Sequence, residues 1–478
     1  MSAKFYDSIE QAVTDILQDI DGDIYLGAPL GIGKSNPFIN AVYRHITKTP
    51  ERSLHIYSAL SLNKPQANSD IEARFLEPFV ERVFGNYPNL DYVTDLKAGK
   101  VPHNISVNEF FLKSGDWLNN PNAQQHYINS NYTHIARDMA AKGINIICQA
   151  IAVREEPTGE KRYSLSCNSD LSVDILDLLQ ARRDKGEKIF AVGVINHELP
   201  FMPNDAEVSA DQFDVIITDP IGTHTLFSTP NMKISLTDYA IGLHTSSLVL
   251  DGGTLQIGIG SLGDAIAHSL IMRDQDNGTY SNIIKSLNHN LPLTTHQDVT
   301  PFAQGLYGCS EMFVNGFWKL IQANIVRRPV YQHTALQTLI NKGLISDTVS
   351  LDTLKVLREH DVISSPLEGQ DIALLERLGI FNDDCTFEDG FITIGDVTIS
   401  TDLDDEDTLQ KIKAHCLGDK LQGGIIMHGG FFLGPADFYQ ALRELPEEQR
   451  QQIGMSTIAF INQLYGDRYG DEPLKRAQ

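Results

Sequence analysis

The sequence predicts an α/β protein with mostly parallel sheets, and two features of the chain support this prediction. Apolar runs rich in β-branched residues, such as 143–153 and 189–195, alternate with segments of helical spacing. Glycine-rich turns follow several of the runs, and strand, turn, helix is the order typical of a parallel sheet. The chain has 478 residues, which at about 100–200 residues per domain provides for two to four domains.

The elements of the first half follow from this alternation. Apolar periodicity of 3.6 residues predicts helices, and short apolar runs bounded by glycine or polar turns predict strands. In chain order, we expect helix 1–20, strand 23–27, a helix near 38–45, strand 53–58, a helix ending at 142, strands 143–153, 189–195 and 213–219, and helix 235–250.

A second unit is expected to begin near residue 251, with a strand at 254–258 and a helix at 264–272. We therefore divide the chain into domains 1–245 and 246–478. Residues 330–425 mix short helices with an acidic run, and we expect them to form an insertion in the second domain.

Two features of this insertion can be predicted separately. Residues 391–400 are expected to form a hairpin with a Gly-Asp turn. The acidic run at 401–408 is expected to be a solvated loop, because its spacing does not fit a calcium-binding loop.

The composition excludes several classes of protein. The net charge of −24 opposes binding to nucleic acid or to an anionic membrane surface. No apolar run approaches the roughly 20 residues of a membrane span, and the N-terminus does not resemble a signal peptide. The five cysteines include no CxxC motif, which favours reduced thiols in the cytoplasm over disulfides or a metal site.

The segment Ala28–Ser35 fits a relaxed Walker A pattern, with Lys34 in the place of the phosphate-binding lysine. Pro37 argues against that interpretation, because proline removes an amide from the first turn of the following helix. A tight turn between a strand and a helix explains the same residues. A P-loop nucleotide-binding protein remains an alternative.

Two further glycine motifs are candidates for ligand binding. The segment 258–263 has the form GxGxxG but lacks the acidic partner of a dinucleotide fold. Free N–H groups at the start of a helix would still attract a phosphate, carboxylate or oxyanion. The segment 427–435 forms either a ligand-facing turn or an ordinary strand-to-helix turn. The candidate ligand-binding residues are Gly258, Ile259, Gly260, Ser261, Leu262, Gly263, Gly429 and Gly430.

Three segments, in this order along the chain, carry a resemblance to a known family: Val194–Met202, Asp251–Ile266 and Gly305–Gly316. Together they resemble the acetyl-CoA hydrolase/4-hydroxybutyrate CoA-transferase family. The resemblance implies two CoA-transferase-like α/β domains, the second incomplete and carrying the insertion. It also implies that segment 258–263 binds coenzyme A and that Glu311 is the catalytic nucleophile.

The chain departs from the family pattern at several places. Gly263 stands where the family commonly has proline, and Asn315 where it commonly has aspartate. The family's later GGQxxF and TEYG segments are not found. A truncated, non-catalytic protein that binds coenzyme A or a partner is therefore the first alternative, and the P-loop protein is the second.

The resemblance implies an acyl-CoA hydrolase or acyl-CoA:carboxylate CoA-transferase of acetate metabolism. Its reaction would pass through a glutamyl-CoA thioester on Glu311. Acyl-CoA, with acetyl-CoA as the first candidate, and a small carboxylate would be substrates, without a metal or a permanently bound cofactor. Whether the protein forms a homo-oligomer is left open.

Three other sites have competing interpretations. The polar clusters 130–134 and 168–170 either line an acyl pocket or cap helices. Cys309, close to Glu311 in sequence, is expected to be a small packing residue, because no histidine or asparagine is placed by sequence to activate it.

Overall fold

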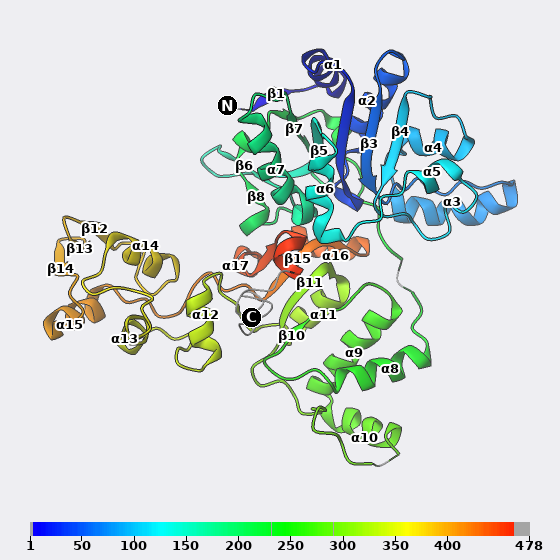
Figure 1. Cartoon of the computed structure of the whole chain (residues 1–478). Coiled ribbons are helices and arrows are strands. Elements are labelled where there is room, and N and C mark those ends of the chain that lie inside the picture. The colour runs from blue at the N-terminus through cyan, green and yellow to red at the C-terminus, as the bar shows by residue number, and fades with distance from the viewer. Residues whose placement is uncertain (1–2, 231, 290, 463–478) are drawn as a thin grey trace. The chain divides into compact units, whose positions relative to one another are not determined.

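The computed structural model describes residues 3–230, 232–289 and 291–462. The described residues divide into two compact units (Figure 1). Unit 1 contains the chain up to Arg327 and the segment Met427–Asn462, and unit 2 contains Arg328–Ile426. Unit 1 holds two sheets whose main strands are parallel, so the predicted fold class is confirmed. The division into domains 1–245 and 246–478 stays a prediction.

The first sheet of unit 1 has nine strands, and its main path runs β1-β9-β7-β5-β2-β3-β4. All neighbours along this path are parallel, whereas β6 pairs antiparallel with β5 and β8. The strands are β1 Lys4–Tyr6, β2 Ile24–Leu30, β3 Leu54–Ala59, β4 Ile105–Glu109, β5 Ile146–Glu155, β6 Lys161–Ser164, β7 Phe190–Ile195, β8 Glu207–Val208 and β9 Val215–Ile217.

The strand order of this sheet reverses between β2 and β5. From β2 the chain continues to β3 on one side, and from β5 it continues to β7 on the other side. Open α/β sheets bind ligands at the carboxyl ends of their strands, next to such a reversal.

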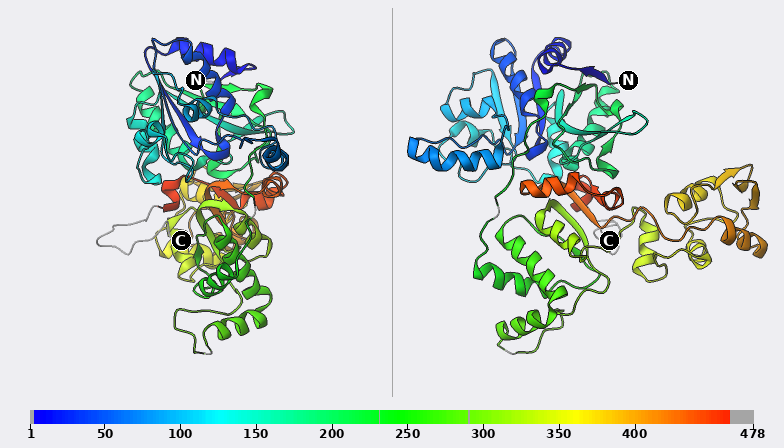
Figure 2. Two further views of the ribbon diagram at one scale, coloured as in Figure 1. Left: turned by 90° about the vertical axis from the view of Figure 1, so that its right-hand side faces the viewer. Right: turned by 180° about the vertical axis from the view of Figure 1, so that it is seen from behind.

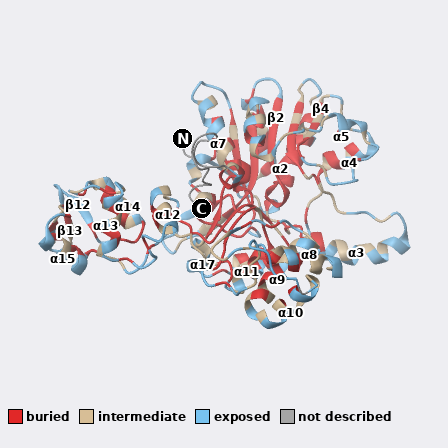
Figure 3. Ribbon diagram, turned by 60° about the horizontal axis from the view of Figure 1, so that its bottom comes forward, coloured by how far each residue is buried: buried red, intermediate tan, exposed pale blue. Residues whose placement is uncertain are grey.

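Most helices of this region pack against the first sheet through their apolar faces, whereas α3 buries only its last two residues. Helix α1, for example, buries Ile9, Val13 and Ile16, and the Ser8 side chain caps it by accepting a hydrogen bond from the Gln11 N–H. Figure 3 shows buried residues concentrated along the strands of unit 1. The helices are α1 Ile9–Asp19, α2 Asn36–Thr47, α3 Asp70–Phe84, α4 Asp91–Ala98, α5 Pro121–Gln125, α6 Ile135–Ala141 and α7 Ser169–Arg183.

The second sheet of unit 1 has four parallel strands in the order β10-β11-β15-β16. Its two central strands are neighbours, although all of unit 2 separates them in sequence (Figures 1 and 2). The strands are β10 Thr254–Leu255, β11 Tyr307–Val314, β15 Met427–Leu433 and β16 Ile453–Met455. The helices are α8 Leu236–Ser246, α9 Ser261–Gln275, α10 Asn277–Leu287, α11 Asn315–Gln322, α16 Ala436–Arg443, α17 Glu447–Gln451 and α18 Ile458–Asn462.

Arg273 of α9 is a fully buried arginine. It connects α9 to the end of α8, to the loop that follows α8 and to the loop before β11. Its guanidinium donates hydrogen bonds to the carbonyl oxygens of Ser246, Val249 and Thr300. It also lies 2.9 Å from the Asp298 carboxylate. The charge of this buried side chain is therefore both paired and hydrogen-bonded.

Unit 2 has its own apolar core, whose buried members all lie between Tyr331 and Leu421. It contains the antiparallel sheet β12-β13-β14, and β13 and β14 form the hairpin predicted at 391–400. The two ends of unit 2 are paired, because Val330 and Ile425 exchange backbone hydrogen bonds of 2.9 Å. The elements are α12 Thr334–Asn341, α13 Leu351–Glu359, α14 Gly369–Arg377, β12 Thr386–Glu388, β13 Phe391–Ile394, β14 Val397–Ser400 and α15 Glu406–His415.

The acidic run 401–408 is only partly a loop, which corrects the prediction. Helix α15 begins at Glu406, because the Asp405 side chain accepts a hydrogen bond from the Thr408 N–H and caps the helix. Among the described residues, no group of His, Cys, Asp or Glu side chains has the arrangement of a metal site. No helix in the same residues has the length and apolar character needed to cross a bilayer.

Candidate active site around Glu311

Glu311 lies near the middle of β11, one of the two central strands of the second sheet. Ser310 pairs with Gly429 and Met312 with Phe431, so Glu311 stands opposite Gly430 of β15. Paired residues of neighbouring parallel strands point to the same face of a sheet. The Glu311 side chain therefore points to the face of the sheet on which a side chain at Gly430 would lie.

The Glu311 carboxylate is half-buried, and this burial raises its pKa above the usual value of a glutamate. Within the described part of the chain, no group donates a hydrogen bond to this carboxylate. An exposed or ion-paired glutamate would be solvated or neutralised. Glu311 is only partly exposed, and among the described residues it has no ion pair.

Asp170, the second residue of α7, lies on the same face as Glu311. A Cβ atom added at Gly430 would lie 2.9 Å from the Glu311 carbonyl oxygen and 3.4 Å from the Asp170 Cβ. Gly430 thus lies between the backbone of Glu311 and the Asp170 side chain. No side chain at Gly430 separates Asp170 from the strand that carries Glu311, and the two carboxyl groups interact electrostatically.

The Asp170 carboxyl group is fully buried and hydrogen-bonded. The Tyr132 hydroxyl donates to one oxygen, and the Asn168 side-chain amide donates to the other at 3.2 Å. Burial raises the pKa of Asp170 to about 7, the negative charge of Glu311 adds to this effect, and the two hydrogen bonds oppose it. Two neighbouring carboxyl groups, one of them fully buried, resist being ionised together.

The loop 258–263 follows β10 and leads into α9. Gly260 stands at the N-cap of α9 with φ of +123°, a conformation that favours glycine. The Ser310 hydroxyl donates to the Ile257 carbonyl at 3.2 Å and so holds the start of this loop beside β11. The first N–H groups of α9 are therefore close to the strand that carries Glu311.

A cavity of about 250 Å³ adjoins this loop. Of the candidate residues, Ile259 and Gly260 line it, whereas Glu311 does not. The carboxyl ends of β11 and β15 form its other side. The lining residues are Thr229, Pro230, Met232, Ile259, Gly260, Asp264, Val314, Asn315, Leu433, Gly434 and Pro435.

Gly429 and Gly430 are buried inside β15, so the ligand-facing turn is wrong, whereas the other interpretation of 427–435, a strand that turns into a helix, is confirmed. The chain turns later, between Leu433 and the start of α16. Glycine is needed within the strand because its neighbours are close. A Cβ atom at Gly429 would lie 2.9 Å from the Phe313 Cβ, on the face opposite to Gly430.

The Lys34 side chain is not placed to bind a phosphate. Its side chain is buried, and its Nζ donates a 2.7 Å hydrogen bond to the Ala59 carbonyl oxygen at the end of β3. Burial lowers the pKa of Lys34 to about 8, against the opposing charge of Glu109. The segment forms the strand-to-helix turn that was the other interpretation of its sequence.

The polar clusters at 130–134 and 168–170 contribute Tyr132, Asn168 and Asp170 to the site. Capping also occurs, since Asn131 accepts a hydrogen bond from the Thr133 N–H. The sequence analysis did not select Tyr132 or Asp170 individually, because capping residues give the same pattern. Cys309 is buried within β11.

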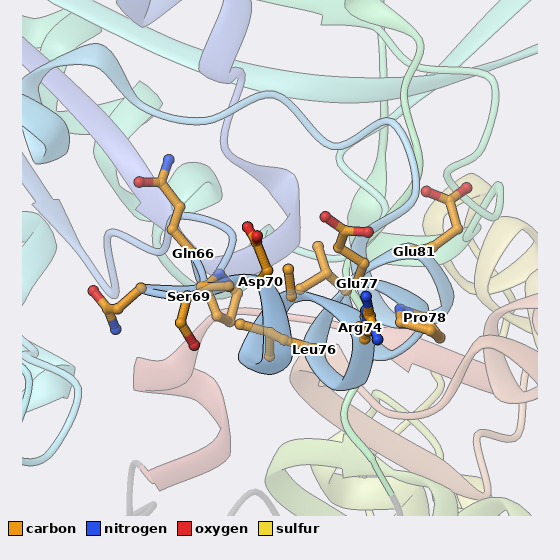
Figure 4. A pocket seen from close by; sticks show the side chains of 13 residues that line it. Gln66, Ser69, Asp70, Arg74, Leu76, Glu77, Pro78 and Glu81 are labelled. Atoms are coloured by element: carbon orange, nitrogen blue, oxygen red, sulfur yellow. The ribbon is translucent and has the colours of Figure 1, made fainter.

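A larger hollow of about 930 Å³ lies at the start of α3, between Pro65 and Glu81 (Figure 4). One continuous segment lines it, and it contains none of the predicted site residues. We therefore place the candidate site at Glu311.

Comparison with known proteins supports the fold. No family model and no curated protein matches the sequence. A structure of a RipA variant superposes with a TM-score of 0.51 at 13% identity, covering 96% of this chain and 69% of that chain. RipA from Yersinia pestis gives a TM-score of 0.49 at 13% identity, with 96% and 69% covered. The 4-hydroxybutyrate CoA-transferase of Porphyromonas gingivalis gives 0.43 at 12% identity, with 96% and 68% covered.

The chain is thus an α/β protein with two parallel sheets and a small antiparallel sheet. Its fold is similar to that of RipA over almost its whole length. At this level of identity the similarity concerns the fold, and function must be argued from the site.

Proposed function

We propose that this protein is an acyl-CoA hydrolase or acyl-CoA:carboxylate CoA-transferase with Glu311 as its nucleophile and acetyl-CoA as its acyl donor. The main observation is the state of the Glu311 carboxylate. It is half-buried, its pKa is raised, and no described group donates a hydrogen bond to it. A carboxylate that water solvates only partly and that has no cation partner is a better nucleophile than a fully exposed one.

The proposed reaction divides a difficult exchange into two steps. A Glu311 oxygen attacks the thioester carbonyl, the carbon–sulfur bond breaks, and coenzyme A leaves as a thiolate, so that a mixed anhydride remains. The thiolate then attacks the Glu311 carbonyl and releases the free carboxylate, which leaves a glutamyl-CoA thioester. A second carboxylate reverses these steps in a transferase, and water intercepts the intermediate in a hydrolase.

The loop 258–263 is proposed to bind the substrate. N–H groups at the start of α9 can stabilise the oxyanion of the tetrahedral intermediates or a phosphate of coenzyme A. The adjoining cavity, which Ile259 and Gly260 line, provides room for part of the substrate. We assign Gly430 the role of leaving space beside Glu311, and Gly429 a packing role on the other face.

This proposal requires no metal and no permanently bound cofactor. We propose acyl-CoA and a small carboxylate as the substrates of the protein, and acetate metabolism in the cytoplasm as its role. Lys34 is buried against Ala59, so we do not propose nucleotide binding.

The test is the intact mass of the protein after incubation with acetyl-CoA and sodium borohydride. Borohydride reduces a glutamyl thioester to a primary alcohol, so the side chain permanently loses an oxygen atom and gains two hydrogen atoms. We expect this mass loss in the wild type and not in Glu311→Gln. Glu81→Gln is the control, because Glu81 is an exposed glutamate of α3, and it should behave like the wild type.

Two outcomes would contradict the proposal. An unchanged wild-type mass would exclude the covalent mechanism and leave the non-catalytic, CoA-binding alternative. An equal mass loss in Glu311→Gln would place the nucleophile at another residue.

A further inference from the structure

A second carboxyl group, that of the fully buried Asp170, lies on the same side of the sheet as the half-buried Glu311. Asp170 has no exposed surface, and its Cβ lies on the same face of the second sheet as the Glu311 side chain. Burying one carboxylate is unfavourable, and burying two close together without a cation is more so. The pair therefore has to change its protonation when the charge of either member changes.

The surroundings of Asp170 are built to hold either form of its carboxyl group. The Tyr132 hydroxyl and the Asn168 amide are in place as donors for a carboxylate. Asn168 is fixed in turn, because its side-chain oxygen accepts a 3.0 Å hydrogen bond from the Gly33 N–H. The donors stabilise the anion, while burial and the charge of Glu311 stabilise the neutral acid.

The other titratable groups that face Asp170 do not change charge near neutral pH. They are Tyr132, from the 3-10 turn Tyr132–His134 before α6, and Cys167, just before α7. Burial raises the pKa of Tyr132 and of the Cys167 thiol well above their usual values, so both stay protonated. In β15, Gly430 and Phe431 contribute no titratable side chain. Glu311 is thus the one described neighbour whose charge the proposed reaction removes.

We propose that Asp170 is a positioning residue that holds a proton while Glu311 is ionised and releases it when Glu311 becomes a thioester. This inference rests on the proposed function and deepens it. In the first state the negative charge is on Glu311. When the thioester forms, that charge leaves with the product carboxylate, the O–H bond of Asp170 breaks, and its proton passes to solvent. The site then holds one negative charge again, on Asp170, where Tyr132 and Asn168 stabilise it.

The direction of the pH effect follows from the same charges. While Glu311 is ionised, the pKa of Asp170 is about 7, so Asp170 is largely neutral below this pH. Burial, the larger cause of the raised pKa, remains when the Glu311 charge is lost, but the smaller cause is removed, so Asp170 then ionises at a lower pH. Proton release should therefore be greatest midway between these two pKa values, and so at a pH below 7. Above about pH 7 both groups are anions before the reaction, which opposes the binding of anionic substrates.

The experiment measures two quantities in a single turnover, with the protein in excess over acetyl-CoA. One is thioester formation, from the borohydride-dependent mass loss, and the other is proton release, from a pH indicator in weak buffer. We compare the wild type with Asp170→Asn, which has nearly the same shape but cannot ionise. Asp177→Asn is the control, because Asp177 is an exposed aspartate of the same helix.

In the wild type and in Asp177→Asn, we expect up to about half a proton per thioester, in the phase in which the thioester forms. The rate of thioester formation should fall as the pH rises through about 7. In Asp170→Asn we expect no proton in that phase and no such fall in rate. A purely structural role of Asp170 would change the rate equally at every pH.

If Asp170→Asn does not fold, the same two quantities are measured in Tyr132→Phe. Removal of this donor disfavours the Asp170 anion, so the pH of greatest proton release should move upward. Thioester formation in the wild type without proton release, or with the same pH profile in Asp170→Asn, overturns this inference and leaves the role of Glu311 intact. Absence of the thioester in the wild type overturns the proposed function itself.

Discussion

Gly430→Ala is the substitution that tests the geometry of the site most directly. The added methyl group would lie 2.9 Å from the Glu311 carbonyl oxygen and 3.4 Å from both the Asp170 Cβ and the Ile461 Cδ1. The first contact is closer than side-chain carbons normally come, and the atom it meets is part of the backbone. A shift of β11 or β15 is therefore required.

The size of the shift sets the expected effect on the reaction. Ordinary van der Waals contact begins at 3.4 Å, so the 2.9 Å contact must lengthen by 0.5 Å. A displacement of 1 Å at a catalytic group reduces rates by roughly 10²-fold, so half of that predicts about a tenfold slower formation of the thioester. Crowding a packed interior also destabilises the fold by about 1–3 kcal/mol.

Gly429→Ala separates these two effects. Its methyl group would meet the Phe313 Cβ at the same distance of 2.9 Å, but on the other face of the sheet. We expect both variants to lose a similar amount of unfolding free energy, measured by urea denaturation. Only Gly430→Ala should slow thioester formation, measured by borohydride trapping at a temperature where both variants are folded.

Equal rates in the two variants would refute this reasoning. The face of β15 toward Gly430 would then not be the reacting face, and the approach of Asp170 to Glu311 would have no part in the reaction.

Two further predictions concern stability. Burial lowers the pKa of Lys34 from 10.5 to about 8, so between these values the unfolded chain binds more protons than the folded one. The free energy of unfolding should therefore increase by about 3 kcal/mol as the pH rises through this window. Lys34→Met should not show this increase. Urea unfolding at pH values just below and just above the window measures the difference. An identical pH dependence in the variant would show that Lys34 is charged in the fold. Arg273→Met leaves the carbonyl oxygens of Ser246, Val249 and Thr300 without their donor and should lower the free energy of unfolding by about 3–5 kcal/mol. A loss below about 1 kcal/mol would mean that water replaces the guanidinium.

The strands predicted from local sequence are those that are apolar along their length. The run 143–153 overlaps β5 and the run 189–195 overlaps β7, because both strands lie in the interior of the first sheet. The hairpin at 391–400 was predicted from its Gly-Asp turn. In these elements the local pattern and the tertiary environment agree.

Elements that depend on distant partners could not be predicted. Residues 4–6 form a strand instead of the start of a helix, because Lys4 pairs with Val215 far along the chain. Gly429 and Gly430 resemble a turn in sequence, but the close approach of Phe313 and Glu311 places them inside a strand.

The site shows the same limit. Glu311 was selected because its sequence context resembles a known family, whereas Asp170 has a sequence context that suits a helix start equally well. Its relation to Glu311 depends on the register of β11 with β15 and on the packing of α7 against β15. Neither is visible in local sequence.

The paired ends of unit 2 bear on how the chain folds. Strand β11 cannot gain β15 as its neighbour until the ribosome has made all of Arg328–Ile426. Closing so long a flexible loop adds an entropic cost and slows the pairing of the two strands. Unit 2 has a core of its own, and the bridge between Val330 and Ile425 brings its two ends together. If unit 2 forms first, β15 reaches β11 across a short connection. The order of synthesis then favours assembly of the face that carries Glu311 only after unit 2 has been made.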